Sequence, residues 1–277
     1  VATPIGNVRD ITLRALDILF CADVLAAEDT RTLRRLMDIH CIPLLDRPLI
    51  SYHDHSASNT RNKLLDFLRA GKSVAYTAEA GTPLVADPGY KLLQHAIKDG
   101  QAITVAPGAA ALLPALMLAG LPTDSFYFDG FLPSGKSARR ARLEKLSDVC
   151  ATLIFYESPR RLAGMLQDAC DILGPDREAA YCRELTKKFE EVQRGSLQKL
   201  RDLVENKEPK GECVVLVGRG IKKNKIKDED VLTAIQTALE IMSLRDASQL
   251  VAETFGLPKR EIYQRALKLT KNLKLKT

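Results

Sequence analysis

Short apolar runs alternate with stretches of helical periodicity along most of the chain. In its first part, runs rich in β-branched and small apolar residues predict strands at residues 1–7, 24–27, 49–55, 73–76 and 101–105. Apolar positions spaced three or four residues apart predict the intervening helices at 10–22, 33–37, 63–69 and 92–97. Strands that alternate with helices are typical of parallel α/β layers.

The same alternation begins again after the segment Leu121-Pro122-Thr123-Asp124, which we interpret as a domain junction. Strands are predicted at 125–128, 152–156, 179–183 and 212–217, and helices at 137–146, 160–173 and 197–205. The fold class is therefore α/β, with an N-terminal α/β domain over 1–119 and a second α/β domain over 120–218.

The last part of the chain has a different composition. Residues 219–230 read as a charged linker, and residues 231–277 as a small helical domain. Two helices, at 246–257 and 259–269, are separated by a Gly-Leu-Pro turn, which fits a helix-turn-helix. A helical hairpin that serves only for packing has the same pattern.

Two loops follow predicted strands of the first domain and are rich in small residues. The stretch TAEAGTPLVADPGY (77–90) contains two glycines and two prolines, and Pro107-Gly108 leads into three alanines. Small residues let a ligand approach the backbone, and ligands in open α/β sheets bind beyond the carboxyl ends of strands. We expect a binding cleft there, although ordinary strand-to-helix turns also use Gly and Pro.

Composition and charge narrow the class of protein. The net charge is +6, and residues 219–277 carry 13 Lys and Arg against 7 Asp and Glu, so the basic excess lies in the tail. A polyanionic partner is one explanation, and a solvated lysine-rich surface is the other. The six scattered cysteines predict buried, reduced thiols, and no apolar run is long enough for a membrane span. A soluble, cytoplasmic protein is expected.

Two motifs suggest a nucleotide-binding phosphate loop and a metal site, and we favour neither interpretation. Residues 130–137, GFLPSGKS, match the phosphate-loop pattern, but Pro133 removes a backbone donor that a phosphate cradle needs. The predicted strand at 49–55 would place His53 and His55 on one side, yet no further ligand is spaced to complete a metal site. We expect no metal, and the absence of GxGxxG argues against a dinucleotide cofactor.

Eight motifs occur in an order that resembles one known family. They are VATPIGN (1–7), AAEDTR (26–31), AGTPLVADPGY (80–90), Pro107-Gly108, GLPTD (120–124), GFLP (130–133), FYESPRRL (155–162) and RELTKKFEE (183–191). Together they resemble the 16S rRNA cytidine 2′-O-ribose methyltransferases of the tetrapyrrole methylase superfamily. The resemblance covers nearly the whole chain. It implies a homodimer that holds S-adenosylmethionine (SAM) in a cleft between two α/β domains and methylates a ribose of the small ribosomal subunit.

The resemblance also implies a set of cofactor contacts, many of them made by backbone atoms. They fall on Pro4, Ile5, Ala80, Gly81, Thr82, Val85, Gly108, Ala110, Ala111, Tyr156, Glu157 and Leu185. Two departures from the family pattern concern side chains. Ala78-Glu79 stands where the family usually has Ser-Asp, and Ala109-Ala110 stands where it usually has Pro-Ser.

The ribose hydroxyl is a weak acid that would benefit from a base. The candidate carboxylates are Glu28, Asp29, Glu79 and Asp87, with Arg31 steering a phosphate; Asp29 is equally suited to cap a helix. The RNA backbone is expected to contact Lys136, Arg139, Arg140, Arg160, Arg183, Lys187, Lys188 and the basic tail. A methylase of small tetrapyrrole-like molecules and a non-enzymatic nucleic-acid-binding regulator are the alternatives.

Overall fold

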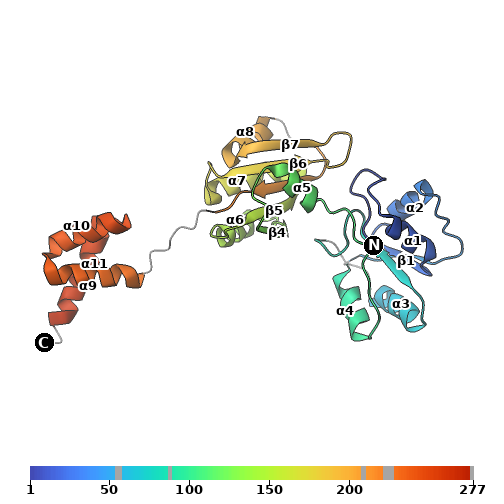
Figure 1. Cartoon of the computed structure of the whole chain (residues 1–277), viewed down its shortest axis with the longest axis horizontal. Coiled ribbons are helices and arrows are strands. Elements are labelled where there is room, and N and C mark those ends of the chain that lie inside the picture. Colours follow the sequence, from blue (N-terminus) through green and yellow to red (C-terminus); the bar gives the residue numbers. More distant parts are fainter. Residues whose placement is uncertain (54–57, 87–88, 207–209, 221–227, 275–277) are drawn as a thin grey trace. The chain divides into compact units, whose positions relative to one another are not determined.

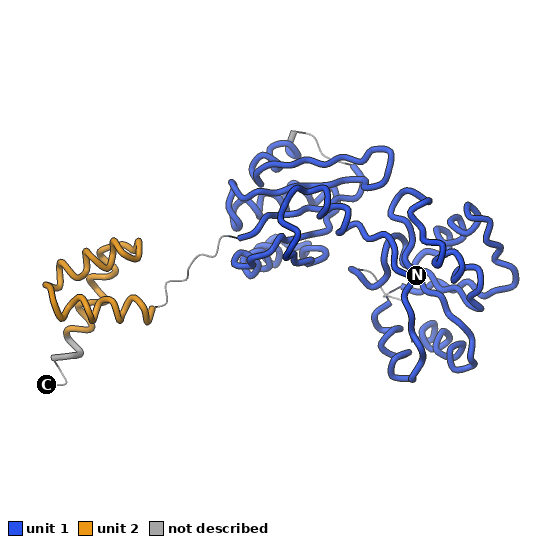
Figure 2. The backbone as a smooth tube through the Cα atoms, viewed as in Figure 1, with its two compact units in different colours: residues 1–221 blue, residues 222–277 orange. Residues whose placement is uncertain are grey.

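The chain divides into two compact units, Val1–Ile221 and Lys222–Thr277 (Figure 2). The computed structural model describes residues 1–53, 58–86, 89–206, 210–220 and 228–274. Unit 1 contains both sheets of the protein's described part, and the described residues of unit 2 form helices and the turns between them.

The first part of unit 1 is a parallel sheet of order β2-β1-β3. Figure 1 shows β1 of this sheet with helices α1 to α4 around it. Its elements are α1 (Leu13–Cys21), β1 (Val24–Ala27), α2 (Thr30–Ile39), β2 (Leu49–Ser51), α3 (Ser58–Arg69), β3 (Val74–Thr77) and α4 (Tyr90–Lys98). Strand β1 is buried at every position, because Leu25 and Ala27 pack with α1 and α2 while Val24 and Ala26 pack with α3 and α4. Burial on both faces explains why this strand reads as a continuous apolar run.

The second part of unit 1 is a mixed sheet of order β4-β5-β8-β6-β7, in which only β4 and β5 are parallel neighbours. Its elements are α5 (Leu112–Ala119), β4 (Phe126–Phe131), α6 (Lys136–Leu146), β5 (Thr152–Glu157), α7 (Pro159–Leu173), β6 (Glu178–Arg183), β7 (Glu191–Ser196), α8 (Leu197–Asn206) and β8 (Cys213–Val217).

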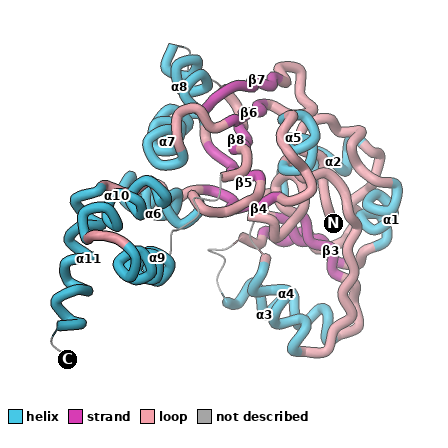
Figure 3. Tube along the Cα trace, turned by 60° about the vertical axis from the view of Figure 1, so that its left-hand side comes forward, coloured by secondary structure: helices cyan, strands magenta, loops and turns pink. Residues whose placement is uncertain are grey.

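Two cores cover the faces of this second sheet. On one face, Leu153 and Phe155 of β5 pack with α6, α7 and α8. On the other face, Ile154 packs with α5 and with Ile5 from the start of the chain. Figure 3 shows α7 and α8 on one side of the strands and α5 on the other. The N-terminal segment is therefore part of the second sheet's core.

Unit 2 is a three-helix group with its own core. It consists of α9 (Asp228–Ile241), α10 (Leu244–Phe255) and α11 (Lys259–Lys274). Val231, Ile235, Val251 and Ile262 are among its buried residues. Gly256 ends α10 with a φ of 63°, a left-handed conformation that favours glycine.

Several expectations about local structure are wrong. Residues 1–7 contribute only a bridge between Thr3 and Gly81, and residues 101–105 form no strand, because Ile103 and Val105 are exposed and their segment has no ladder partner among the described residues. Strand β7 was missed because this polar edge strand pairs only with β6 and shows no apolar alternation. Helix α9 was missed as well.

The prediction that all six cysteines are buried is wrong for half of them. Cys21, Cys41 and Cys150 are exposed, whereas Cys170, Cys182 and Cys213 are buried, and all six are free thiols. Burial raises the pKa of Cys182 to about 12 and that of Cys213 to about 11. The buried thiols are therefore held in their unreactive protonated form.

A buried ion-pair cluster joins α6 to α7. Asp168 is 1% exposed and accepts hydrogen bonds from Arg139 at 2.7 Å and Arg140 at 3.0 Å. Asp171 also accepts from Arg140, at 2.8 Å. The expectation that Arg139 contacts RNA is therefore wrong, because its guanidinium is buried against Asp168. The positive charge of Arg140, also expected to contact RNA, is largely neutralised by two carboxylates.

We expect Asp168→Ala to lower the free energy of unfolding by about 3 kcal/mol, because it leaves the buried Arg139 guanidinium without its partner. Urea denaturation followed by circular dichroism measures this loss. Asp171→Ala, which removes an exposed partner of the same cluster, should cost far less. Equal losses in the two variants would contradict this account.

Candidate functional site

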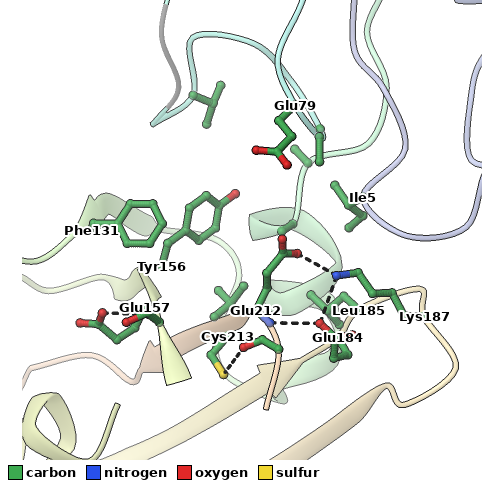
Figure 4. Close-up of a pocket in the computed structure, with 18 of the residues that line it drawn as sticks. Ile5, Glu79, Phe131, Tyr156, Glu157, Glu184, Leu185, Lys187, Glu212 and Cys213 are labelled. Atoms are coloured by element: carbon green, nitrogen blue, oxygen red, sulfur yellow. Dashed lines mark hydrogen bonds and ion pairs between the residues drawn. The ribbon is translucent and has the colours of Figure 1, made fainter. Parts of the chain in front are cut away.

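A cavity of about 740 Å³ lies in unit 1 between the turns that leave several strands (Figure 4). Its wall brings together most of the residues expected to contact a cofactor. They are Ile5, Ala80, Gly81, Thr82, Val85, Ala110, Ala111, Tyr156, Glu157 and Leu185. The wall also includes Glu28, Glu79 and Lys187. Pro4 adjoins the wall residue Ile5, and Gly108 lies two residues before the wall residue Ala110, but neither lines the cavity. Asp87 lies outside the described residues.

Backbone and hydroxyl contacts hold the cavity's small-residue loops against one another. Thr3 and Gly81 exchange N–H···O bonds of 2.9 and 3.0 Å. The Thr82 hydroxyl donates to the carbonyl of Ala109 at 2.8 Å, and the Leu112 N–H donates to the Tyr156 hydroxyl at 3.2 Å. These bonds join the loops of the wall to one another and to Tyr156.

Gly81 shows why the wall uses small residues. Its φ is 81°, and a Cβ added there would lie 3.2 Å from Cγ2 of Ile5 and 3.6 Å from the carbonyl of Ala109. A side chain would close the space that the glycine leaves open. This cradle, lined by backbone and alanines, fits a ligand recognised through backbone amides and carbonyls, which is what the family resemblance implies for SAM.

Backbone strain is concentrated in two loops of this wall. Of the six described non-glycine residues with positive φ, four lie in these loops: Leu84, Ala86, Glu184 and Thr186, with φ values of 71°, 63°, 50° and 63°. Left-handed conformations of such residues cost about 1–3 kcal/mol each and occur often at functional sites. The strained residues flank Val85 and Leu185, both of which line the cavity.

The charges of the wall favour a cation. It contains Glu28, Glu79, Glu157, Glu184 and Glu212, and Lys187 is the cation among its described residues. The Glu28 carboxylate accepts the backbone N–H of Glu79 at 3.2 Å. Figure 4 shows the Glu79 carboxylate pointing into the cavity. An excess of carboxylates disfavours a phosphorylated ligand and attracts a sulfonium or an ammonium group.

Glu157 is the buried carboxylate of the wall. It is 2% exposed, and one of its oxygens accepts the backbone N–H of Ser158 at 2.9 Å and lies 3.2 Å from Nε of Arg161. Burial raises the pKa of Glu157, and the Ser158 N–H and the Arg161 charge offset part of that rise.

Asp29 and Arg31 have a structural role beside the cavity. Asp29 is the N-cap of α2, where it accepts the backbone N–H of Arg31 at 2.8 Å and pairs with the Arg31 guanidinium at 2.8 Å. The Arg31 side-chain and backbone hydrogen bonds lower the pKa of Asp29 to about 2. A carboxylate held so firmly in its ionised form is a poor proton acceptor.

The capping role predicts a pH dependence. The folded-state pKa of Asp29 is depressed, so its stabilising effect should be present above pH 4 and disappear as the pH falls through about 2. We expect Asp29→Ala to lower the thermal midpoint at pH 7 and to have a much smaller effect near pH 2. Thermal unfolding at the two pH values measures this, and an equal shift at both would contradict the assignment.

The remaining predicted RNA contacts fall into two groups. Lys136, Arg160 and Lys188 are exposed. Arg183 pairs with Glu191 at 2.5 Å, and Lys187 lies in the cavity wall between two carboxylates instead of facing an RNA backbone.

Several wall residues were not predicted from the sequence. They are Phe131, Ser158, Pro159, Glu184, Gly211, Glu212, Cys213 and Val214. Some lay within motifs already quoted, such as GFLP and FYESPRRL, and the signal was their place at the ends of β4 and β5. Residues 211–214 carried no such signal, because β8 reaches the wall only through its pairing with β5 and β6.

The segment that matches a phosphate loop is built differently from one. Nη2 of Arg161 donates to the carbonyls of Leu132 and Pro133 at 2.5 and 3.3 Å, so the loop directs carbonyl oxygens toward a protein cation. A phosphate cradle would direct N–H groups toward its ligand.

The described residues contain no group of three or more His, Cys, Asp and Glu placed to hold a metal ion. His53 is exposed, and His55 lies outside the described residues. Among the described helices, none has the length and apolar character that crossing a lipid bilayer requires.

Comparison with known proteins agrees with this geometry. The family described as Tetrapyrrole (Corrin/Porphyrin) Methylases matches residues 1–201, and the one described as RsmI C-terminal HTH domain matches residues 226–270. The ribosomal RNA small subunit methyltransferase I of Mesorhizobium japonicum is 47% identical over 97% of this chain and 90% of its own length.

Solved structures show the same fold at low sequence identity. A cobalt precorrin-4 methyltransferase of cobalamin biosynthesis has a TM-score of 0.58 at 16% identity, covering 79% of this chain and 92% of that one. The uroporphyrin-III C-methyl transferase from Thermus thermophilus, complexed with S-adenyl homocysteine, has a TM-score of 0.52 at 20% identity, covering 77% of this chain and 93% of that one.

The family match over most of unit 1, the helix-turn-helix match over unit 2 and the identity along nearly the whole chain agree. The chain belongs to the tetrapyrrole methylase family and, within it, to the ribosomal RNA small subunit methyltransferase I enzymes.

Proposed function

We propose that this methyltransferase transfers the methyl group of SAM to the ribose 2′-hydroxyl of a cytidine in 16S rRNA, within the small ribosomal subunit. The observation that carries the proposal is the cavity, with its small-residue cradle and its excess of carboxylates. The related fold that binds S-adenyl homocysteine and the rRNA methyltransferase I relatives support it. Membership of an enzyme family argues against the non-enzymatic regulator.

In this proposal the wall residues bind and orient the methyl donor. Ile5, Val85 and Leu185 supply apolar contacts, and the backbone around Gly81 and Ala110 supplies hydrogen-bonding groups. The bound cofactor would supply an electrophilic methyl group on a sulfonium. Holding the ribose hydroxyl against that methyl can lower the activation free energy by about 7–11 kcal/mol, because the translational and rotational entropy of the two groups is lost on binding and not in the chemical step.

Glu79 is the best candidate for accepting the hydroxyl proton. Its side chain is exposed to the cavity, whereas the Glu28 carboxylate already accepts the Glu79 backbone N–H. We propose that Glu28 positions the Glu79 loop and that Glu79 takes the proton as the methyl transfers.

We propose that unit 2 binds the RNA. On α11, Arg260, Gln264 and Lys268 are exposed and spaced four residues apart, so they share one face of the helix. Such a stripe can contact phosphates while the core residues of the same helix pack inward. In this proposal, residues 1–119 and 120–218 act as two α/β domains around the cavity. The RNA-binding domain begins at Asp228, the first residue of α9, three residues earlier than the sequence predicts.

We further propose a cytoplasmic homodimer. The free thiols fit a reducing compartment, and the exposed Leu13 and Phe20 of α1 offer apolar surface for a second copy. Sedimentation of the wild-type chain measures its oligomeric state.

The decisive experiment offers methyl-labelled SAM with purified small ribosomal subunits and then maps the label. We expect one labelled ribose, recognised because a 2′-O-methyl group protects the adjacent phosphodiester from alkaline cleavage. Label on a base would overturn the ribose assignment. Transfer to a tetrapyrrole, with none to rRNA or subunits, would favour the small-molecule methylase.

A further inference from the structure

One wall of the cavity is a tight turn of residues 184–187, Glu-Leu-Thr-Lys, which follows β6. Glu184 and Thr186 are both left-handed. The backbone N–H of Glu184 donates to the carbonyl of Glu212 at 3.0 Å, and the N–H of Thr186 donates to the Glu190 carboxylate at 2.7 Å. The turn holds Leu185 buried against the cavity (Figure 4).

The 184–187 turn is pressed against the N-terminal segment of the chain. The backbone N–H of Asn7 donates to the Thr186 hydroxyl at 3.1 Å. A Cβ added to Gly6 would lie 2.5 Å from Cγ of Lys187, 2.7 Å from the Thr186 hydroxyl and 3.0 Å from the Leu185 carbonyl. Gly6 is therefore required for the turn to lie where it does, beside the Ile5 part of the wall.

Lys187 closes the turn with two ion pairs. Its Nζ lies 3.1 Å from Glu184 and 3.0 Å from Glu212, and its side chain is 28% exposed. The same Glu184 oxygen accepts the backbone N–H of Glu212 at 3.0 Å. Without the ammonium, two carboxylates would face each other at the point where the turn meets the start of β8.

We propose that Lys187 is a positioning residue for the methyl donor: by bridging Glu184 and Glu212 it holds the 184–187 turn, and with it Leu185, in the conformation that completes the cofactor wall. The inference rests on the proposed function, since it names SAM as the ligand. It replaces the expectation that Lys187 binds the RNA backbone.

The test compares Lys187→Met, Lys187→Arg and a matched control, Lys188→Met, in the full chain. Lys188 is the next residue and is exposed, with its ammonium 5.6 Å from the Phe189 ring. Calorimetry with SAM and with S-adenosylhomocysteine gives both affinities. We expect Lys187→Met to weaken both ligands about tenfold, Lys187→Arg to restore most of the loss, and Lys188→Met to leave both within about twofold.

Using both ligands separates positioning from a direct charge effect. Removing a cation makes the cavity more negative, which by itself would strengthen binding of the cationic SAM relative to its neutral-sulfur product. A rise in that preference without a common loss of affinity would overturn the proposal. So would a Lys187→Met variant that binds both ligands normally but shows a weaker salt dependence of rRNA binding.

Two further variants keep the test decisive if Lys187→Met does not fold. Glu212→Gln removes one side of the bridge from a side chain that is 77% exposed, and we expect a loss of about threefold for both ligands. Gly6→Ala should reproduce the loss through the added Cβ, and normal affinity in both variants would refute the idea. Failure of the wild-type chain to bind either ligand would instead refute the proposed function.

Discussion

Replacing Ala110 by Trp is expected to abolish binding of the methyl donor, with a loss of at least about a hundredfold in affinity. Ala110 lines the cavity in the segment just before α5, and it lies outside the apolar clusters that hold the fold together. An indole there would occupy the space meant for the ligand and displace its contacts with the Gly81 and Thr82 loop. Calorimetric titration with SAM measures the effect.

Met117→Trp is the matched control for that variant. Met117 is 81% exposed on α5, a few residues further along the same segment, so the same large side chain there should leave SAM affinity unchanged. Thermal midpoints within a few degrees of wild type would show that both variants fold. If Ala110→Trp bound SAM normally, the cavity would not be the cofactor site.

Removing residues 222–277 is expected to weaken rRNA binding about a hundredfold to a thousandfold while leaving SAM affinity unchanged. The described part of unit 2 exposes Arg245, Lys259, Arg260 and Lys268, and the cavity is built from unit 1 alone. If these four side chains contact phosphates, the slope of log affinity against log salt should fall by about 3 to 4. Binding to small subunits at several salt concentrations measures both quantities.

A charge variant of the full chain separates loss of contacts from loss of a domain. Replacing Arg260 and Lys268 by Ala removes two charges from the exposed face of α11 without touching the core residues Ile262 and Ala266. The salt slope should then fall by about 2. An unchanged slope in both the truncated and the substituted chain would rule out the RNA-binding role of unit 2.

The elements that were predicted well are those whose burial produces an apolar pattern within a few consecutive residues of the sequence. The strands β1, β5 and β8 are covered on both faces by residues of hydrophobic cores, so each appears in the sequence as a short continuous apolar run. Other elements have no pattern in the sequence that matches their structure. β7 was missed because it is a polar edge strand. The segment 101–105 was wrongly predicted as a strand, because it is apolar enough to resemble one but is exposed and has no ladder partner among the described residues.

The site divides in the same way. The wall residues Gly81 and Tyr156 were implied by the family resemblance, and they lie in motifs at the ends of β3 and β5. The partner of each charge could not be found, because an ion pair is formed by residues distant in sequence. Arg139 reads as a member of a basic helix, yet it is buried against Asp168, which is 29 residues away.

The sequence by itself determined the α/β class, the order of most helices and strands, the basic character of the tail and the small-residue loops around which the cavity forms. Periodicity and side-chain size decide those features within a few residues. Only the tertiary structure decided that Glu28 holds the Glu79 loop, that Gly211 and Val214 belong to the wall, and that Lys187 bridges Glu184 and Glu212. These contacts depend on which strands pair and which turns meet, and long-range packing sets that choice.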